Sequence, residues 1–372
     1  MKNPFNIKIL QDEREFCNRA KERADLLRYA RNGTNVVLCS PRRYGKSSLV
    51  TMMLSDLRKE GFLTVYADLF PISSEQDLIN RFASAIFKGI GQGVDQRSIL
   101  EKAKDIFASL RPTIEATQEG YSVSVKYDRQ QVSNPPLDGL MEGLYKYVKK
   151  KKLSACVVLD EFQEFTELPD AKRIEGTLRS YIQFQKEISY FYVGSRRRIL
   201  QDMFNNRSRP FYKSAFFYTL DKISADDFAG YIEECFKTTG KACHPDIAKN
   251  IYDRANGYPY YVQKLASIVW DSTEKDCAAE IVSQAFRSLV AVETADFEGI
   301  WSGLSLIQKS VMKAVANDPT AKPYAREYLE RNQLSLGGAQ KALNVLLKKD
   351  LLERSKDGVY TLTDPIMAAW LD

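Results

Sequence analysis

The feature that most restricts the fold of this chain is a short apolar run that passes into a glycine-containing loop and then into a helical pattern. The run is Asn35–Cys39, and the loop Ser40–Ser47 follows it directly. Apolar residues then recur at helical spacing at Leu49, Met53 and Leu57. A strand, a tight loop and a helix in this order form the first half of a βαβ unit, so the sequence predicts a parallel sheet.

Further short runs of apolar and β-branched residues alternate with longer helical patterns, as in a parallel sheet covered by helices on both faces. The predicted strands after the first are Leu63–Asp68, Ala155–Leu159, Tyr190–Val193 and Ala215–Leu220. The segment from about residue 89 to 136 is longer than one crossover requires, and we interpret it as an insertion. Strict alternation over Tyr121–Tyr127 predicts a small exposed strand there, in either a solvated excursion or a partner-binding arm.

After the last predicted strand the pattern changes to helices alone, which indicates a small helical lid. Ser224 has the character of an N-cap at its start. Three later helical patterns, Leu306–Ala316, Ala325–Gln333 and Ala339–Lys348, precede two short strands joined at Asp357-Gly358. Three helices and a β-hairpin are the components of a winged helix-turn-helix.

The expected architecture is therefore α/β, with a parallel-sheet core over residues 1–220, a helical lid over 221–290 and a winged helix-turn-helix over 291–372. A length of 372 residues allows two or three domains. No apolar run approaches the roughly 20 residues that span a bilayer, and six cysteines lack any Cys-x-x-Cys spacing. We expect a cytoplasmic protein with reduced thiols and no membrane partner. The single histidine, His244, argues against a histidine-based triad or metal site.

The loop that follows the first strand has the composition and the context of a phosphate-binding Walker A loop. Gly45 allows the main chain to approach a phosphate, Lys46 supplies a cation, and the Ser47 hydroxyl can ligate magnesium. Backbone N–H groups of the loop and of the first helical turn favour phosphate as well. The candidate nucleotide-binding residues are Ser40, Pro41, Arg42, Arg43, Tyr44, Gly45, Lys46, Ser47 and Ser48. A serine at position 40 departs from the glycine that usually begins this motif.

A second motif is the apolar strand that ends in Asp160 and Glu161, as in a Walker B segment. Asp160 stands at the carboxyl end of its strand and is predicted to hold magnesium opposite Ser47. Glu161 is predicted to orient and deprotonate the attacking water. Many strands end in aspartate, so the motif becomes specific through its pairing with the phosphate-binding loop.

Two further candidates for nucleotide chemistry rest on weaker patterns. Ser195 or Arg196, after another predicted strand, is placed to sense the γ-phosphate, although an ordinary strand-to-helix cap would use the same residues. Arg209 precedes the fifth predicted strand and is a candidate arginine finger that accelerates hydrolysis. The alternative for Arg209 is an ordinary surface arginine.

Taken together, these segments resemble the archaeal-type ATPases of the STAND group, relatives of AAA+ and origin-recognition ATPases, over nearly the whole chain. The resemblance rests on Phe16–Glu22, Ser40–Leu49, Leu159–Glu164, Gly194-Ser195, Arg209–Tyr212, Gly257–Tyr260 and Asp364–Leu371. It implies that ATP binds between the sheet domain and the lid, with Arg19 near the adenine and ribose and Pro259 on the lid facing the nucleotide. A first-position serine in the loop also occurs in this family. The alternative interpretation of these two segments is structural: the first would be an ordinary helix N-terminus and the second an ordinary helix C-cap.

The leading functional hypothesis is a switch that binds ATP or ADP with Mg²⁺, hydrolyses ATP slowly and couples lid movement to the C-terminal unit. In this hypothesis the C-terminal unit binds a DNA or protein partner, and the chain acts alone or as a homo-oligomer. A scaffold that binds nucleotide without hydrolysing it is an alternative.

The main rival is a nucleotide-regulated DNA-binding protein, with Ala339–Lys348 as its recognition helix. The residues that would meet DNA phosphates are Lys341, Lys348 and Lys349, with Arg354 or Lys356 on the wing. Acidic residues in the same small region fit a protein-docking module equally well, and these are Asp350, Glu353 and Asp357.

Overall fold

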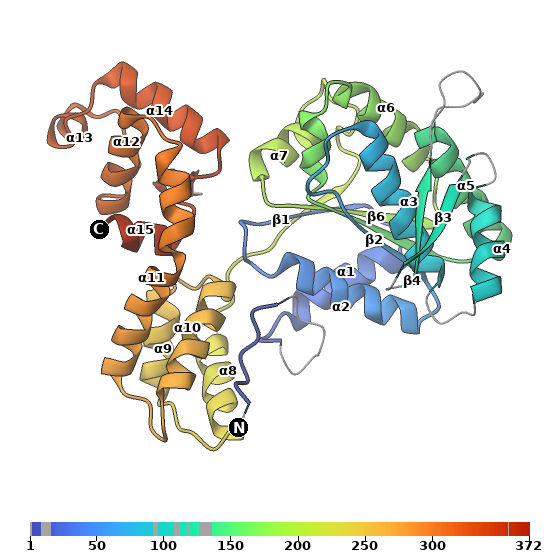
Figure 1. Ribbon diagram of the computed structural model, residues 1–372. Coiled ribbons are helices and arrows are strands. Elements are labelled where there is room, and N and C mark those ends of the chain that lie inside the picture. The colour runs from blue at the N-terminus through green and yellow to red at the C-terminus, as the bar shows by residue number, and fades with distance from the viewer. Residues whose placement is uncertain are drawn as a thin grey trace. The chain divides into compact units, whose positions relative to one another are not determined.

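The structure is a computed structural model, and it describes residues 2–8, 16–91, 96–107, 110, 112–117, 120–125, 136–355 and 357–372. Residue contacts divide the chain into two compact units. The sheet unit is Arg19–Asp221, and the helical unit joins Met1–Asn18 to Lys222–Asp372. Figure 1 labels most of the elements of both units. The three-domain division expected from the sequence stays a prediction.

The sheet unit is built on a five-stranded parallel sheet with the strand order β2-β5-β6-β1-β7. Its strands are β1 (Val36–Cys39), β2 (Leu63–Asp68), β5 (Ala155–Asp160), β6 (Ile188–Gly194) and β7 (Phe216–Thr219). All five predicted strands are present, which confirms the expected parallel α/β sheet. Because the strands are parallel, their carboxyl ends meet at one edge.

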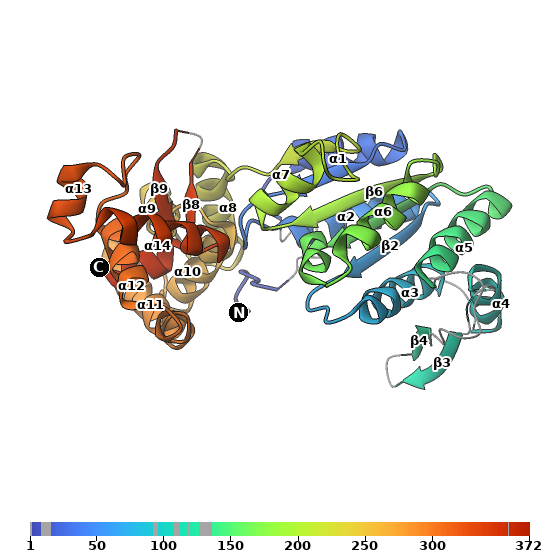
Figure 2. The same cartoon turned by 90° about the horizontal axis from the view of Figure 1, so that it is seen from above.

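Helices cover both faces of this sheet (Figures 1 and 2). One face carries α1 (Ala20–Arg31) and α2 (Lys46–Lys59), and the other carries α3 (Glu75–Gly91), α5 (Pro136–Lys151), α6 (Ala171–Ile182) and α7 (Arg197–Asn205). Tyr190 and Tyr192 of β6 are fully buried in the core on the second face, with Phe204 of α7. Leu49, Met53 and Leu57 of α2 are buried as well. Strands buried on both faces explain the continuous apolar runs.

The segment between α3 and α5 contains the predicted insertion. Its described elements are α4 (Gln96–Ile106) and the antiparallel pair β3 (Pro112–Thr117) and β4 (Gly120–Val125). The alternating pattern at Tyr121 lies in β4, whereas Lys126 and Tyr127 lie outside the described residues. A role for this segment as a partner-binding arm stays a prediction.

The helical unit begins with α8 (Ala225–Thr238), α9 (Pro245–Arg254), α10 (Pro259–Ser272) and α11 (Ala279–Ser302). Ser224 caps α8, since its hydroxyl accepts a hydrogen bond from the N–H of Asp227. Phe5, near the N-terminus, packs its ring against Tyr231 and Phe236 of α8. Over the described ranges, no helix combines the length and the apolar character that a membrane span requires.

The C-terminal elements are α12 (Leu306–Asn317), α13 (Arg326–Arg331), α14 (Leu336–Lys348), β8 (Leu352–Arg354), β9 (Tyr360–Leu362) and α15 (Pro365–Leu371). Three helices and an antiparallel hairpin confirm the predicted winged helix-turn-helix. The third helix starts a turn before the predicted Ala339 because Ser335 caps it, accepting from the N–H of Gly338. The preceding helix is shorter than predicted, and α11 runs unbroken across residue 290, where we expected the lid to end.

Candidate functional site

The loop between β1 and α2 closes around the side chain of Lys46. The Lys46 ammonium donates hydrogen bonds to the carbonyl oxygens of Ser40 and Pro41, both at 2.9 Å. Gly45 has a φ of 82°, in the left-handed region that favours glycine, and α2 begins at the next residue. Burial lowers the pKa of Lys46, and the nearby Glu161 and Asp160 act in the opposite direction. The loop therefore holds a buried cation at the N-terminus of a helix, an arrangement suited to phosphate.

The remaining loop residues line the outside of this turn or pack beneath it. Arg42 and Arg43 are exposed, and Arg43 has a φ of 68°. Tyr44 and Ser48 are buried, and Ser40 is fully buried. The structure therefore places two guanidinium groups on the surface of the loop and leaves its lysine inside.

The carboxylate of Asp160, at the end of β5, is tied to two neighbouring elements. Its Oδ2 accepts from the Ser47 hydroxyl at 2.8 Å and from the Tyr66 hydroxyl at 2.5 Å. Its Oδ1 accepts from the N–H of Glu161 at 2.9 Å. The structure thus brings together the two residues predicted to hold magnesium, Ser47 and Asp160. This constellation stands at the edge where the strands end.

Tyr66 was not among the residues singled out from the sequence. Burial, then the charge of Asp160, raises the pKa of Tyr66 well above its ordinary value, so the hydroxyl stays a donor. Tyr66 pairs in register with Val158, two residues before Asp160. Because side chains alternate along a strand, Tyr66 and Asp160 point to the same face of adjacent strands. The sequence does not show that β2 and β5 are neighbours, so the contact between Tyr66 and Asp160 could not be predicted from it.

Glu161 directly follows β5 and has a φ of 48°, in the left-handed region. Its Oε2 accepts from Gln163 Nε2 at 2.5 Å and from the Ser195 hydroxyl at 3.2 Å. The predicted base and the predicted phosphate sensor are therefore in direct contact. Gln163 is fully buried, and among the described residues its Oε1 has no hydrogen-bond partner. A Cβ at Gly194 would come within 2.1 Å of that oxygen, so the Gln163 amide would have to move to make room for it.

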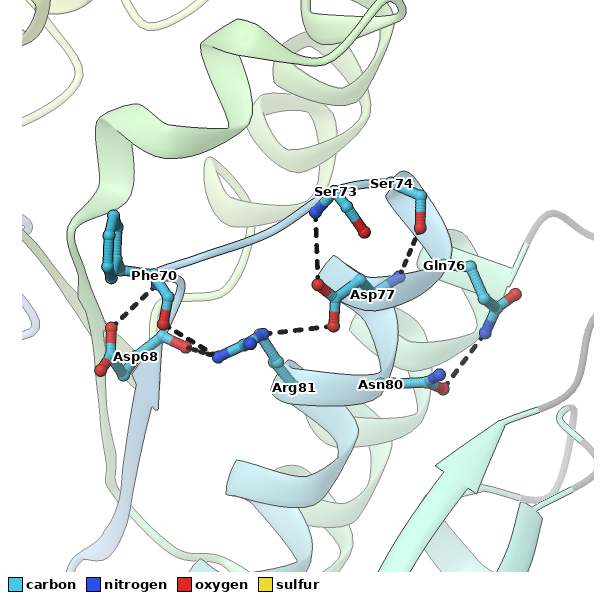
Figure 3. Close-up of polar contacts among 8 residues, drawn as sticks. All are labelled: Asp68, Phe70, Ser73, Ser74, Gln76, Asp77, Asn80 and Arg81. Carbon is cyan, nitrogen blue, oxygen red and sulfur yellow. Dashed lines mark hydrogen bonds and ion pairs between the residues drawn. The ribbon is translucent and has the colours of Figure 1, made fainter. Parts of the chain in front are cut away.

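A further acidic residue, Asp68, ends β2 and pairs in register with Asp160. Burial raises the pKa of Asp68, while the N–H of Phe70, which donates to Oδ1 at 2.9 Å, acts in the opposite direction. Arg81 of α3 donates to the carbonyls of Asp68 and Phe70 and to the carboxylate of Asp77 (Figure 3). This guanidinium fastens the segment after β2 to α3 and so fixes the end of the strand beside Asp160.

Arg209 forms an ion pair with a carboxylate that the sequence did not single out. Its Nη2 lies 2.8 Å from Oε2 of Glu175, a fully buried residue of α6, and its Nε lies 3.8 Å from Asp202. Burial raises the pKa of Glu175, and the charge of Arg209 opposes that shift. In this structure the guanidinium therefore links α6 to the segment before β7, and its role as an arginine finger stays a prediction.

Arg19 and Pro259, the two residues assigned by resemblance, lie in different units. Arg19 is buried at the N-terminus of α1, where it donates to Glu22 at 2.6 Å and to the carbonyl of Asp221 at 2.7 Å. Pro259 is the first residue of α10 in the helical unit, after Gly257 with a φ of 65°. Contact of either residue with a nucleotide stays a prediction.

Known structures share this architecture. The Walker-type ATPase PABY2304 of Pyrococcus abyssi is similar with a TM-score of 0.71, at 14% identity, over 99% of each chain. The ORC2 protein of Aeropyrum pernix in its ADP form has a TM-score of 0.51, at 13% identity, over 95% of this chain and 93% of that one. The A. pernix ORC1 protein in complex with DNA has a TM-score of 0.50, at 14% identity, over 98% and 93%.

The C-terminal segment has a match of its own. Residues 295–372 match the model of a family described as a probable winged helix domain. No protein with a curated description is significantly similar to the chain in sequence. The expected likeness to P-loop ATPases related to the archaeal origin-recognition proteins is thus confirmed at the level of the fold.

Proposed function

We propose that this chain, which has the fold of Walker-type ATPases with a C-terminal winged helix, binds ATP with Mg²⁺ and hydrolyses it as a molecular switch. One observation carries the proposal: the Ser47 hydroxyl of the loop meets the Asp160 carboxylate at the end of β5, at 2.8 Å. A hydroxyl and a carboxylate facing each other beside a buried lysine form the arrangement that P-loop ATPases use for a metal-bound triphosphate.

Lys46 and the loop amides are the proposed triphosphate ligands. In the structure the Lys46 ammonium is held by two carbonyl oxygens, and both are neutral acceptors. Charged phosphate oxygens are stronger acceptors for an ammonium, so ATP would compete well for this cation. The similar ORC2 structure is described as an ADP form, which supports a nucleotide as the ligand.

Ser47 and Asp160 are the proposed holders of Mg²⁺. Both present hard oxygen ligands, which fit this cation, and phosphate oxygens and water would complete its coordination. When bound, the ion neutralises charge on the phosphates during transfer. The Tyr66 hydroxyl donates to Oδ2 of Asp160, the same oxygen that accepts from Ser47, and so helps to orient the carboxylate.

Glu161 is the proposed general base for the attacking water. Gln163 and Ser195 both donate to Oε2, which orients the carboxylate while Oε1 can accept the proton. In this proposal Ser195, which follows β6 beside β5 and donates to Glu161, senses the γ-phosphate.

A lid that responds to the nucleotide completes the proposed switch. ATP can move the lid only by the difference between its affinities for the open and closed forms. In this proposal Pro259 begins the lid helix that faces the nucleotide, Arg19 lies near the ribose, and Arg209 acts after release from Glu175. The winged helix passes this change to a DNA or protein partner. The protein acts in the cytoplasm, as a single chain or as a homo-oligomer.

DNA binding through the winged helix is the second candidate, and the surface of α14 favours it. The exposed residues along this helix include Gln340, Lys341, Asn344 and Lys348, which are polar or basic. Such side chains suit phosphate and base contacts. The similar ORC1 protein was solved in complex with DNA. Lys356, also expected on the wing, lies outside the described residues.

The test uses the full chain with ATP and MgCl₂. The wild type should bind ATP and release phosphate, Lys46→Ala should lose binding, and Glu161→Gln should bind ATP while its turnover falls by roughly 10² to 10⁴. Lys59→Ala, at the exposed end of the same helix, is the matched control. Absence of any nucleoside triphosphate affinity in the wild type, with Mg²⁺ in excess, would overturn the proposal.

The DNA candidate is tested separately by titrating duplex DNA at several salt concentrations. Binding that weakens with salt and is lost when Lys341, Lys348 and Lys349 are changed to Ala supports it. Unchanged binding in that triple variant, or none at low salt, would remove it.

A further inference from the structure

Two cysteines from separate loops of the helical unit lie next to each other across a backbone bridge. The loop after α8 and the segment before α11 run parallel, with Ala242 paired to Asp276. The N–H of Ala242 donates to the carbonyl of Lys275 at 2.8 Å, and the N–H of Cys277 donates to that of Ala242 at 2.9 Å. Cys243 and Cys277 each stand one residue further along, directly after this bridge on the two parallel segments.

This register suits a disulfide. Neighbouring strands are about 5 Å apart, and disulfides join residues whose Cα atoms are roughly 4.4 to 6.8 Å apart. The interaction between the two thiols lowers the pKa of Cys277 and raises that of Cys243. Cys243 is buried, whereas Cys277 is partly exposed. A small oxidant can therefore reach the Cys277 thiol, whereas the Cys243 thiol is shielded from solvent.

The surroundings hold both segments at this spacing. The Lys241 ammonium donates to the carbonyls of Trp270 and Thr273, at 2.6 and 2.5 Å, and lies 3.8 Å from the centroid of the Trp270 ring. The Trp270 indole N–H donates to the Thr239 hydroxyl at 2.8 Å. The end of α8 and the end of α10 are thereby fastened together beside the cysteines, so the thiols can join with little movement of the backbone.

We propose that Cys243 and Cys277 form an oxidative modification site, which a hydroperoxide converts to a reversible disulfide. The Cys277 thiolate attacks a peroxide oxygen, the O–O bond breaks, and Cys277 becomes a sulfenic acid. With hydrogen peroxide the departing hydroxide takes up the proton that Cys277 released and leaves as water. The Cys243 sulfur then attacks the sulfenic sulfur, the S–S bond forms, and the hydroxyl leaves as water with the Cys243 proton. Two thiols lose two electrons in total, and one peroxide is reduced to two waters.

The bond would join the loop after α8 to the segment before α11 and enclose α9 and α10. It would restrict the unfolded chain over that stretch, and so it should raise the unfolding temperature of the oxidised protein by about 5 to 10 °C. The site is separate from the phosphate-binding loop, and the inference does not rest on ATP binding.

The full chain is treated with hydrogen peroxide, then alkylated, digested and mapped by mass spectrometry. We expect one dominant cross-link, Cys243 to Cys277, that dithiothreitol reverses. Cys235→Ser, which removes another partly exposed thiol of the same unit, should leave it unchanged. Cys243→Ala should instead accumulate a sulfenic acid at Cys277 that dimedone traps.

Thermal unfolding gives an independent readout. The oxidised wild type should unfold at a higher temperature than the reduced protein, and Cys277→Ser should show no difference between the two treatments. Oxidation spread evenly over the six cysteines, or a cross-link that excludes either residue of the pair, would overturn the proposal.

Discussion

Ser47 and Asp160 are joined by a 2.8 Å hydrogen bond between hydroxyl and carboxylate, although 113 positions separate them in the sequence. The bond connects the first turn of α2 to the end of β5. Asp160 Oδ2 also accepts from Tyr66, so three elements of the sheet unit converge on one oxygen. Contacts among these elements therefore position the carboxylate of the proposed metal site.

Removing the hydroxyl of Ser47 should weaken ATP binding more in the presence of Mg²⁺ than in its absence. Ser47→Ala deletes a proposed metal ligand but leaves Lys46 and the loop amides, so we expect roughly tenfold or greater loss of Mg-ATP affinity and a smaller loss for ATP with chelator. Titrations of ATP with and without MgCl₂ measure this. Thr51→Ala, one turn further along α2, is the control, because its hydroxyl donates to a main-chain carbonyl, that of Ser47. Equal losses with and without Mg²⁺ would argue against a metal at Ser47.

Tyr66→Phe should raise the Mg²⁺ concentration needed for half-maximal turnover by about tenfold, because the Asp160 carboxylate loses an orienting donor. Burial and the Asp160 charge raise the pKa of Tyr66, so its hydroxyl stays protonated at every pH below that raised value. The ratio between variant and wild type should therefore be constant across the neutral and mildly alkaline range. A ratio that changes with pH there would contradict the assignment of Tyr66 as a permanent donor.

Loss of the Gln163 donor should slow hydrolysis without changing nucleotide affinity. Gln163→Leu leaves Glu161 held by Ser195 alone, and we expect roughly a tenfold fall in kcat with an unchanged Kd for ATP. Gly194→Ala should give the same fall, because its Cβ would press on Gln163 Oε1. Gln183→Ala, at an exposed position, is the matched control. A rise in Kd with kcat preserved would instead place Gln163 in nucleotide binding.

The buried pair of Glu175 and Arg209 should matter for stability. Arg209→Ala leaves a fully buried carboxylate unpaired, and we expect the free energy of unfolding to fall by about 3 to 5 kcal/mol. Replacing both residues with apolar ones, Glu175→Leu with Arg209→Met, should recover much of that loss. Denaturant unfolding of the single and double variants measures both effects.

The same double variant separates stability from catalysis. A protein that is stable yet hydrolyses ATP far more slowly than the wild type would assign Arg209 to the reaction. Normal turnover in the stable double variant would mean that the arginine serves the fold alone.

Several features were predictable because they are local. The strand–loop–helix at Val36 to Leu57, the N-cap at Ser224 and the hairpin after α14 follow from contiguous patterns of side-chain period and turn residues. Lys46 and Ser47 are neighbours in sequence, so one motif reveals both. Helix ends were less predictable, as the early start of α14 shows, because one capping serine moves the boundary by a turn.

By itself, the sequence determined the element types, the parallel sheet and the position of the candidate phosphate-binding loop, because these depend on side chains a few residues apart. Only the tertiary structure decided which distant side chains meet: Tyr66 with Asp160, Gln163 with Glu161, Glu175 with Arg209, and Cys243 beside Cys277. Such contacts depend on which strands and loops become neighbours. That choice is made by the packing of the whole core, and no local spacing encodes it.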